Sequence, residues 1–278
     1  MKNFDTQYKE IIKECLNEGY LRPTRSGIAA YSLLGKTIEH DMKLGFPLST
    51  LRKMPQKSIR VETEFYLKGY TDKKWLIDHG CHFWDYWQNP KSKDQNDLGP
   101  TYGFEWRNFG ADYKGIGNYS GQGIDQIMYL IKTIKEDPES KRLIVSQWNP
   151  KDLDQQAVPP CSFAFQILKY GDELTMIFYQ RSADVCLGLP NDFAQHALLL
   201  HLLCLETGYK AGKVIGMFGQ VELYENHTEG AKKLLLANAL PYSIVSTNKF
   251  SNIFDWNFED TEFINYKHGE KINFPIAI

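Results

Sequence analysis

The chain has 278 residues, of which 42% are apolar and 14% aromatic, a content that excludes a disordered chain. No apolar run approaches the ~18 residues of a membrane-spanning helix, and the N-terminal segment lacks the apolar stretch and cleavage site of a secretory signal. A formal net charge of −2 gives no overall attraction to nucleic acid. We therefore expect a soluble, cytoplasmic protein that needs neither a membrane nor a nucleic acid, although local arginines could hold a small anion.

The N-terminal half predicts mostly helices. Apolar residues at helical spacing over 6–18 indicate an amphipathic helix that Gly19 ends. Further helices are expected at about 58–68, 72–79 and 123–136. The Gly-rich segment between the last two carries aromatic residues, so it predicts ordered loops that line a site rather than an interdomain linker.

The C-terminal half predicts a sheet around one interior helix. Strands are expected at 142–148, 161–170 and 173–180, the last two joined by the hairpin turn Gly171-Asp172, then at 213–219 and within 261–269 and 271–278. The segment 192–206 is apolar nearly all round, which predicts a buried helix with Asn191 or Asp192 as N-cap and Gly208 after its end. A second helix is expected near 226–238. Together these elements predict an α+β fold.

The five cysteines have no C-x-x-C spacing, so neither a disulfide framework nor a metal site is predicted. Cys161 follows two prolines at the start of a predicted strand, where a thiolate could act as a nucleophile, although a lone cysteine there is more often a core residue. Arg181 and Ser182 end the paired strand, so a cation, a hydroxyl and a thiol could converge on a phosphorylated ligand. Arg25 and the pair Lys141-Arg142 are further candidates, with solvated surface charge as the alternative.

Five motifs, in this order along the chain, resemble the thymidylate synthase family over essentially its whole length: "DLGPTYGFEW", "DPESKRLIVSQWNP", "VPPCSFAFQ", "YQRSADVCLGLP" and "LYENH". The resemblance implies one catalytic domain over residues 1–278, with a mixed central sheet flanked by helices. It also implies a homodimer whose active site is shared across the interface. Such enzymes use 5,10-methylenetetrahydrofolate to place a one-carbon unit on C5 of a pyrimidine nucleotide.

The resemblance also implies roles for individual residues. The implied catalytic residues are Cys161, Glu62, Asp192, Arg181 and Tyr102. The implied nucleotide-binding residues are Arg25, Gln180, Arg181, Ser182, Asp192, Glu222 and Tyr224, with Lys141 and Arg142 reaching across from the other subunit. The implied folate-binding residues are Trp84, Trp87, Asp184, Gly188 and, in the tail that closes over the site, Ile278. Addition of Cys161 to C6 would turn C5 into a carbon nucleophile, while Glu62 would serve as acid and base.

One departure concerns the base. Synthases carry Phe-Asn where this chain has Asn191-Asp192. The Asn amide matches uracil, whereas Asp accepts a hydrogen bond from the N4 amino group of cytosine. An ionised Asp192 opposite O4 of uracil would cost at least ~1–3 kcal/mol. Asp192 could instead be a helix N-cap. The pair resembles the cytidylate hydroxymethylases of the family, in which water rather than hydride completes the reaction, and polar Asn191 fits a wetter site.

Two further departures concern the sugar and phosphate. Glu222 replaces the synthase His that binds the 3'-hydroxyl, and a carboxylate can accept from both hydroxyls of a ribose. Lys141 replaces an arginine, which could leave room beside the sugar, with tolerated drift as the alternative for both positions. Ser162 stands where synthases carry His, with no assigned effect.

We therefore expect hydroxymethylation of CMP in preference to dCMP. The rivals are dCMP hydroxymethylation, dUMP methylation, and a nucleotide-binding or RNA-binding protein that has kept the fold and lost the chemistry.

Overall fold

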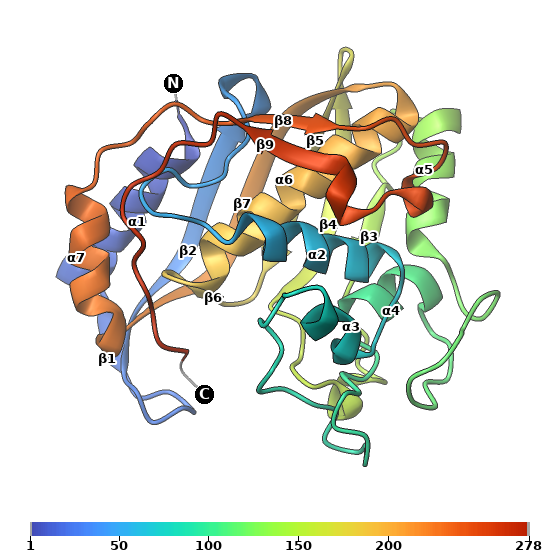
Figure 1. The fold of residues 1–278 in the computed structure, drawn as a ribbon, viewed down its shortest axis with the longest axis horizontal. Coiled ribbons are helices and arrows are strands. Elements are labelled where there is room, and N and C mark those ends of the chain that lie inside the picture. The colour runs from blue at the N-terminus through green and yellow to red at the C-terminus, as the bar shows by residue number, and fades with distance from the viewer. Residues whose placement is uncertain (1, 277–278) are drawn as a thin grey trace.

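A seven-stranded sheet forms the centre of the computed structural model, which describes residues 2–276 (Figure 1). Its strands are β1 (Tyr20–Arg22), β2 (Ala30–Asp41), β3 (Ile144–Ser146), β4 (Ser162–Tyr170), β5 (Glu173–Gln180), β6 (Ala183–Asp184) and β7 (Lys210–Tyr224). They run in the order β1-β2-β7-β5-β4-β3, and β6 pairs with β7. The β5–β7 and β6–β7 pairs are parallel and the others antiparallel, so the sheet is mixed, as expected.

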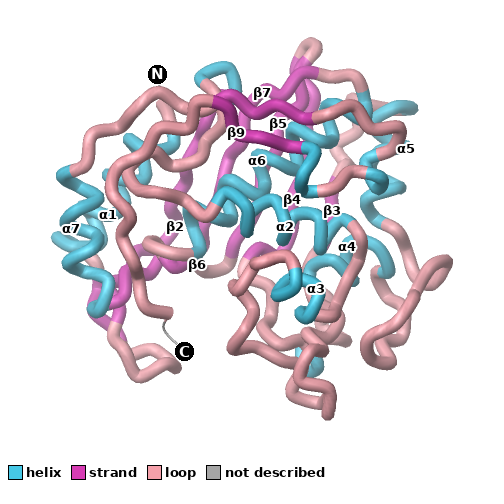
Figure 2. Tube along the Cα trace, viewed as in Figure 1, coloured by secondary structure: helices cyan, strands magenta, loops and turns pink. Residues whose placement is uncertain are grey.

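Helices cover one face of this sheet (Figures 1 and 2). They are α1 (Phe4–Glu18), α2 (Gln56–Leu67), α3 (Lys73–Asp78), α4 (Tyr102–Asn108), α5 (Gln126–Glu136), α6 (Gly188–Thr207) and α7 (Thr228–Leu236). The interior helix α6 contacts β5, β6 and β7, and α2 packs on α6. A small sheet of β8 (Ile244–Thr247) and β9 (Thr261–Ile264) completes the α+β fold. Within residues 2–276 no helix has the length and apolar character to cross a bilayer.

The helix and hairpin predictions are largely confirmed. Five of the six predicted helices correspond to α1, α2, α3, α5 and α7 with end shifts of a few residues, and β4 and β5 form the hairpin with Gly171 at φ +61°. Gly208 ends α6 in the left-handed conformation at φ +80°. The strand predicted at 142–148 is present but shorter, as β3.

Three sequence expectations are wrong or incomplete. Helix α6 begins at Gly188 with Leu187 as N-cap, so neither Asn191 nor Asp192 caps it. Pro190 lies in the first turn, where a backbone N–H needs no intrahelical partner, so it does not delay the start. Residues 271–276 form no strand. The strand β2 was not predicted, because its order comes from long antiparallel pairing with β7 rather than from local propensity.

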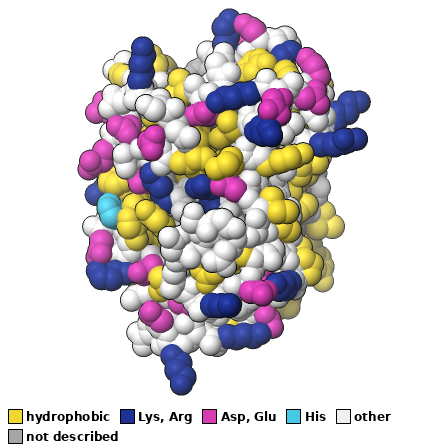
Figure 3. All heavy atoms as spheres, turned by 90° about the vertical axis from the view of Figure 1, so that its right-hand side faces the viewer, with side chains coloured by type: hydrophobic (Ala, Val, Ile, Leu, Met, Phe, Trp, Pro, Cys, Tyr) yellow, Lys and Arg dark blue, Asp and Glu magenta, His cyan; other side chains and the backbone are white. Residues whose placement is uncertain are grey.

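The other face of the sheet carries apolar side chains that none of the helices described within residues 2–276 covers. Tyr179 pairs with Met217, and Ile177 pairs with Ile215, and paired residues point to the same side. Ile144 pairs with Gln166, which pairs with Ile177, so Ile144 lies on the same face of the sheet, and 49% of Ile144 is exposed. Figure 3 views the molecule edge-on to Figure 1, with apolar side chains reaching the margin that is the back of Figure 1.

Candidate active site

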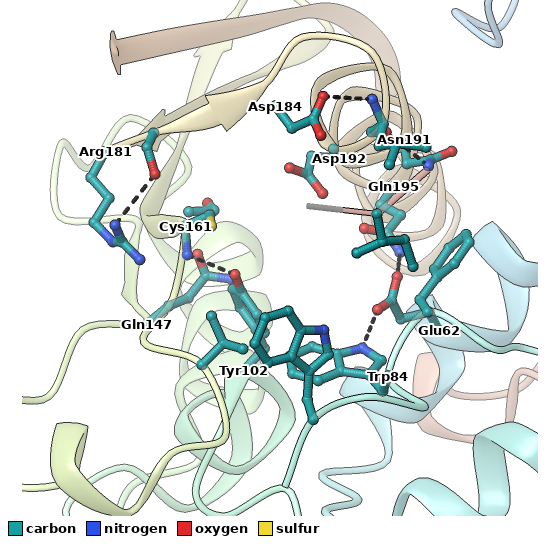
Figure 4. A pocket seen from close by; sticks show the side chains of 18 of the residues that line it. Glu62, Trp84, Tyr102, Gln147, Cys161, Arg181, Asp184, Asn191, Asp192 and Gln195 are labelled. Atoms are coloured by element: carbon teal, nitrogen blue, oxygen red, sulfur yellow. Dashed lines mark hydrogen bonds between the residues drawn. The ribbon is translucent and has the colours of Figure 1, made fainter. Parts of the chain in front are cut away.

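One cavity of about 590 Å³ opens where β4 begins and β5 ends, beside the first turns of α6. Most predicted site residues line it: Arg25, Glu62, Trp84, Trp87, Tyr102, Cys161, Arg181, Ser182, Asp184, Gly188, Asp192, Glu222 and Tyr224. They come from segments far apart in the sequence, namely the β1–β2 loop, α2, the loop after α3, α4, the β4–β5 ends, α6 and β7. Figure 4 shows the central members facing one another across the cavity.

Cys161 lies directly before β4 and is the half-buried cysteine of the chain, the other four being buried. Its backbone N–H donates to the Tyr102 hydroxyl at 2.8 Å (Figure 4), and its carbonyl accepts from the Arg181 N–H at 2.8 Å. The Arg181 guanidinium donates to the carbonyls of Pro160 at 2.9 Å and Pro159 at 2.8 Å. This network fixes the loop that presents the thiol.

Burial and the Asp192 carboxylate raise the pKa of the Cys161 thiol, and Arg181 and the Ser182 hydroxyl act in the opposite direction. In the free protein the thiol is therefore protonated at neutral pH. An anionic ligand close to Arg181 would change this local balance of charges, so the reactivity of Cys161 depends on what occupies the cavity.

Glu62 projects from α2 into the cavity and is only 6% exposed. Its Oε1 accepts hydrogen bonds from the Tyr66 hydroxyl at 2.8 Å and from the Trp84 indole N–H, and its Oε2 accepts from the Gln195 amide. Burial raises the pKa of Glu62, while these three donors act against the shift. The result is an oriented, buried carboxyl group, the kind of group that can take part in proton transfer.

Asp192 lies in the second turn of α6 and lines the cavity opposite Glu62 (Figure 4). Its Oδ2 accepts from the Gln180 amide at 2.5 Å, while Oδ1 has no hydrogen-bond partner among the described residues. Gln180 thus touches the site through Asp192 and does not line the cavity itself. Burial, followed by the charges of Glu62 and Asp184, raises the pKa of Asp192 to about 7 against the Gln180 hydrogen bond.

The opposite end of the cavity combines cations with a carboxylate. Arg25, Arg181 and Ser182 line this end together with Glu222, whose Oε1 accepts from the Gln220 amide at 3.0 Å. Arg22 of β1 also lines it and lies 3.9 Å from Glu222. Sequence reasoning missed Arg22, although it stands three residues before Arg25.

The aromatic wall is formed by Trp84 and Trp87, and Asp184 and Gly188 line the same cavity. Asp184 Oδ1 accepts the backbone N–H groups of Cys186 at 2.8 Å and Leu187 at 3.0 Å, so it caps the turn that leads into α6. Ile278, a predicted contact of this wall, falls outside the described residues.

Two further predicted residues, besides Gln180, lie outside the cavity. Lys141 and Arg142 are exposed on the surface just before β3, and the carbonyl of Lys141 accepts from Gln166 of β4 at 3.0 Å. Gln166 belongs to the uncovered face of the sheet. The basic pair therefore borders that face rather than this chain's own cavity.

Asp184, Cys186 and His227 are the one group of three potential metal donors found within residues 2–276, with ligand atoms within 4.8 Å of one another. Burial lowers the pKa of His227, but Asp184, at 3.6 Å, and the Pro275 carbonyl outweigh it and the net shift is upward. Arg52 donates to the Cys186 carbonyl at 2.8 Å, which places a cation beside the group. These contacts form an ion pair that needs no metal.

Several cavity residues besides Arg22 escaped the sequence analysis, among them Tyr66, Gln147, Gln195 and His196. Three of these four lie at helical spacing from a predicted residue, since His196 follows Asp192 by four positions. Tyr66 follows Glu62 by four positions and Gln195 follows Asp192 by three, so each shares a helix face with a predicted residue.

A thiol, a buried carboxyl, a group of cations and an aromatic wall around one cavity, on a mixed sheet, define the class of group-transferring enzymes. Comparison with family models matches residues 6–278 to thymidylate synthase. A bifunctional dihydrofolate reductase-thymidylate synthase from Paramecium tetraurelia is 34% identical over 283 residues, covering 99% of this chain and 61% of the relative. The chain thus spans about 61% of the length of that curated relative. The chain belongs to the thymidylate synthase family, whose members are folate-dependent one-carbon transferases acting on C5 of pyrimidine nucleotides.

Proposed function

We propose that the protein hydroxymethylates C5 of cytidylate, converting CMP, in preference to dCMP, to 5-hydroxymethyl-CMP with 5,10-methylenetetrahydrofolate and water. The observation that carries this proposal is the place of Asp192. Asp192 lines the cavity that Cys161 also lines, Gln180 donates to its Oδ2, and its Oδ1 has no hydrogen-bond partner among the described residues. An ionised Oδ1 accepts from the N4 amino group of cytosine but finds no proton on O4 of uracil.

The opening step uses Cys161 as the nucleophile. A bond forms between its sulfur and C6 of the base, which places negative charge toward C5 and prepares that carbon for the one-carbon unit. The cations Arg25 and Arg181 would hold the phosphate, and Glu222 would accept from the ribose hydroxyls. Two acceptor oxygens on one carboxylate favour a ribose over a deoxyribose, and Lys141 in place of an arginine leaves room beside the sugar.

Trp84 and Trp87 provide flat apolar surfaces that fit the ring system of a folate. When bound, 5,10-methylenetetrahydrofolate supplies the one-carbon unit. After C5 has taken the one-carbon unit, it would lose its proton and tetrahydrofolate would depart, which leaves an exocyclic methylene on C5. Water would add to that methylene as the S–C6 bond breaks and the Cys161 thiolate is released. Glu62, held by three donors, is the group placed to orient that water and move its proton.

The polar side chain of Asn191 supports completion of the reaction by water. It lines the cavity, its Nδ2 donates to the Leu187 carbonyl at 2.9 Å, and its Oδ1 is buried without a partner among the described residues. This part of the cavity lining is therefore more polar than the phenylalanine of the synthase pattern would make it.

We also propose a homodimer in which Lys141 and Arg142 complete the partner's phosphate site. The uncovered apolar sheet face supports an interface there, and the basic pair borders that face.

A competition assay tests the function. Purified protein receives the folate with equal amounts of CMP, dCMP and dUMP, and products are identified by mass. Hydroxymethyl-CMP as the main product is expected. Hydroxymethyl-dCMP as the main product would contradict the ribose preference argued from Glu222. Methylated dUMP would contradict the proposal and match the thymidylate synthase activity named for the Paramecium relative.

A rival proposal, a binding protein without chemistry, is separated by Cys161→Ser. Turnover that survives this substitution would overturn the covalent mechanism, and absence of turnover in the unmodified protein with all three nucleotides would favour the binding protein.

A further inference from the structure

Four buried polar side chains form a directed chain of hydrogen bonds along the cavity. In the amide orientation that satisfies both of its neighbours, Gln147 accepts from the Trp106 indole N–H at 2.9 Å and donates to Ser162 Oγ at 2.8 Å. Ser162 Oγ lies 3.3 Å from His196 Nε2, and His196 Nδ1 lies 2.7 Å from the backbone carbonyl of Asp192.

Each link of this chain has one possible direction. An indole N–H is only a donor and a carbonyl is only an acceptor, so His196 carries its proton on Nδ1 and accepts the Ser162 hydroxyl at Nε2. Burial lowers the pKa of His196 to about 4, so the ring is neutral at neutral pH and keeps this acceptor. His196 is therefore no proton donor for the reaction.

The chain is also rigid. Ser162 is 4% and His196 7% exposed, so loss of either partner would leave a buried polar atom unsatisfied. The His196 ring stacks on Phe178 of β5, with centroids 4.0 Å apart and planes at 11°, which fixes the ring. Within the chain, Ser162 follows Cys161 directly at the start of β4, and the last link ends on the α6 turn that carries Asp192.

We propose that Ser162 and His196 are a pair of positioning residues that set the separation of Cys161 and Asp192, an inference that rests on the proposed function. The nucleotide must meet Cys161 at C6 and Asp192 at position 4 at once. A small error in the spacing of two such groups lowers the rate of attack strongly, because the bound geometry no longer brings the reacting atoms together.

The test measures the first step without folate. In heavy water, Cys161 adds to C6 while C5 takes up a deuteron. The original C5 proton then leaves and the S–C6 bond breaks, so the deuterium found at C5 of the released nucleotide measures how often Cys161 has added to C6.

We expect Ser162→Ala and His196→Asn each to slow this exchange about tenfold, the effect of one buried hydrogen bond. The double variant should lose little more than either single variant, because both remove the same bond. Ser162→Thr, which keeps the hydroxyl, should retain most of the rate.

His201→Asn is the matched control, because it makes the same change on α6 at a half-buried histidine that contacts Thr247 at 3.0 Å and does not line the cavity. It should leave exchange unchanged at equal folded fraction. An unchanged exchange rate in Ser162→Ala would overturn the proposal that Ser162 and His196 act as a pair. So would a double variant in which the rate losses of the two single variants multiply.

Exchange is run separately with CMP, dCMP and dUMP. Exchange of dUMP alone would overturn the substrate assignment, while a tenfold loss in Ser162→Ala with that nucleotide would still support the pair. If none of the three nucleotides exchanges in the unmodified protein, both the substrate assignment and the positioning role of Ser162 and His196 are overturned.

Discussion

The amide of Gln180 donates to one oxygen of the Asp192 carboxylate at 2.5 Å and leaves the other oxygen to the cavity. A residue at the end of β5 therefore decides which atom of a helix residue can meet a base. Since the occupied oxygen already has a donor, any proton on Asp192 resides on Oδ1, and in the proposed complex the protonation state of this one atom would control what position 4 of the pyrimidine encounters.

The selectivity for cytidylate should depend on pH. Asp192 has its pKa raised to about 7, so Oδ1 is protonated below pH 7 and ionised above it. A protonated Oδ1 can donate to O4 of uracil, whereas an ionised Oδ1 only accepts. We expect the ratio of kcat/KM for CMP over UMP to rise between pH 6 and pH 8. A ratio that is flat or falls over this range would contradict the assignment of Asp192.

Replacing Asp192 by Asn should admit uridylate. The amide presents a donor at position 4, so the penalty of ~1–3 kcal/mol against uracil is removed and UMP binding should strengthen about 10-fold or more, measured by calorimetry. The same variant should bind CMP more weakly. Asp184→Asn, at a carboxylate that caps a backbone turn, serves as the comparison and should not shift base preference.

Cys161 should be the site of alkylation in the native protein. It is half-buried while the other four cysteines are buried, so iodoacetamide is expected to modify it alone, as read by peptide mass. Burial raises the pKa of this thiol above its usual range, so the rate should climb through pH 7 to 9 as thiolate forms. Cytidylate should protect it. Modification of another cysteine at native pH would contradict this.

Glu222 should set the sugar preference. In Glu222→Gln one oxygen becomes a donor, so acceptance from two ribose hydroxyls is lost. We expect kcat/KM for CMP to fall at least about tenfold and that for dCMP to change less, so that the ratio moves toward dCMP. An equal fall in kcat/KM for both nucleotides would contradict this role and indicate that Glu222 acts by positioning Arg22 instead.

A shared active site predicts complementation. Lys141→Ala/Arg142→Ala and Cys161→Ala should each be inactive alone, and after mixing and subunit exchange about a quarter of the sites should be intact, because half the dimers are mixed and each has one complete site. Activity after mixing reports a site built from two chains. A basic-pair variant with full activity would place these residues outside the site.

Local patterns in the sequence are sufficient for several features of the fold. The apolar periodicity of 6–18 specifies α1, and Gly171-Asp172 specifies the β4–β5 hairpin, because each depends on neighbours within a few residues. The start of α6 was misplaced by several residues, since the turn capped by Asp184 extends the helix N-terminally to Gly188. The strand β2 was missed because its partner β7 lies about 180 residues away along the chain.

The sequence by itself determined the family, the nucleophile candidate and the unusual acid at position 192, because these are matters of residue type and order. Only the tertiary structure decided that Asp192 is not a helix cap, that Gln180 occupies one of its oxygens, and that Ser162 is joined to His196. Each of these facts is a distance between residues remote in sequence. Such distances are set by how α6 packs on the sheet, and no local pattern contains them.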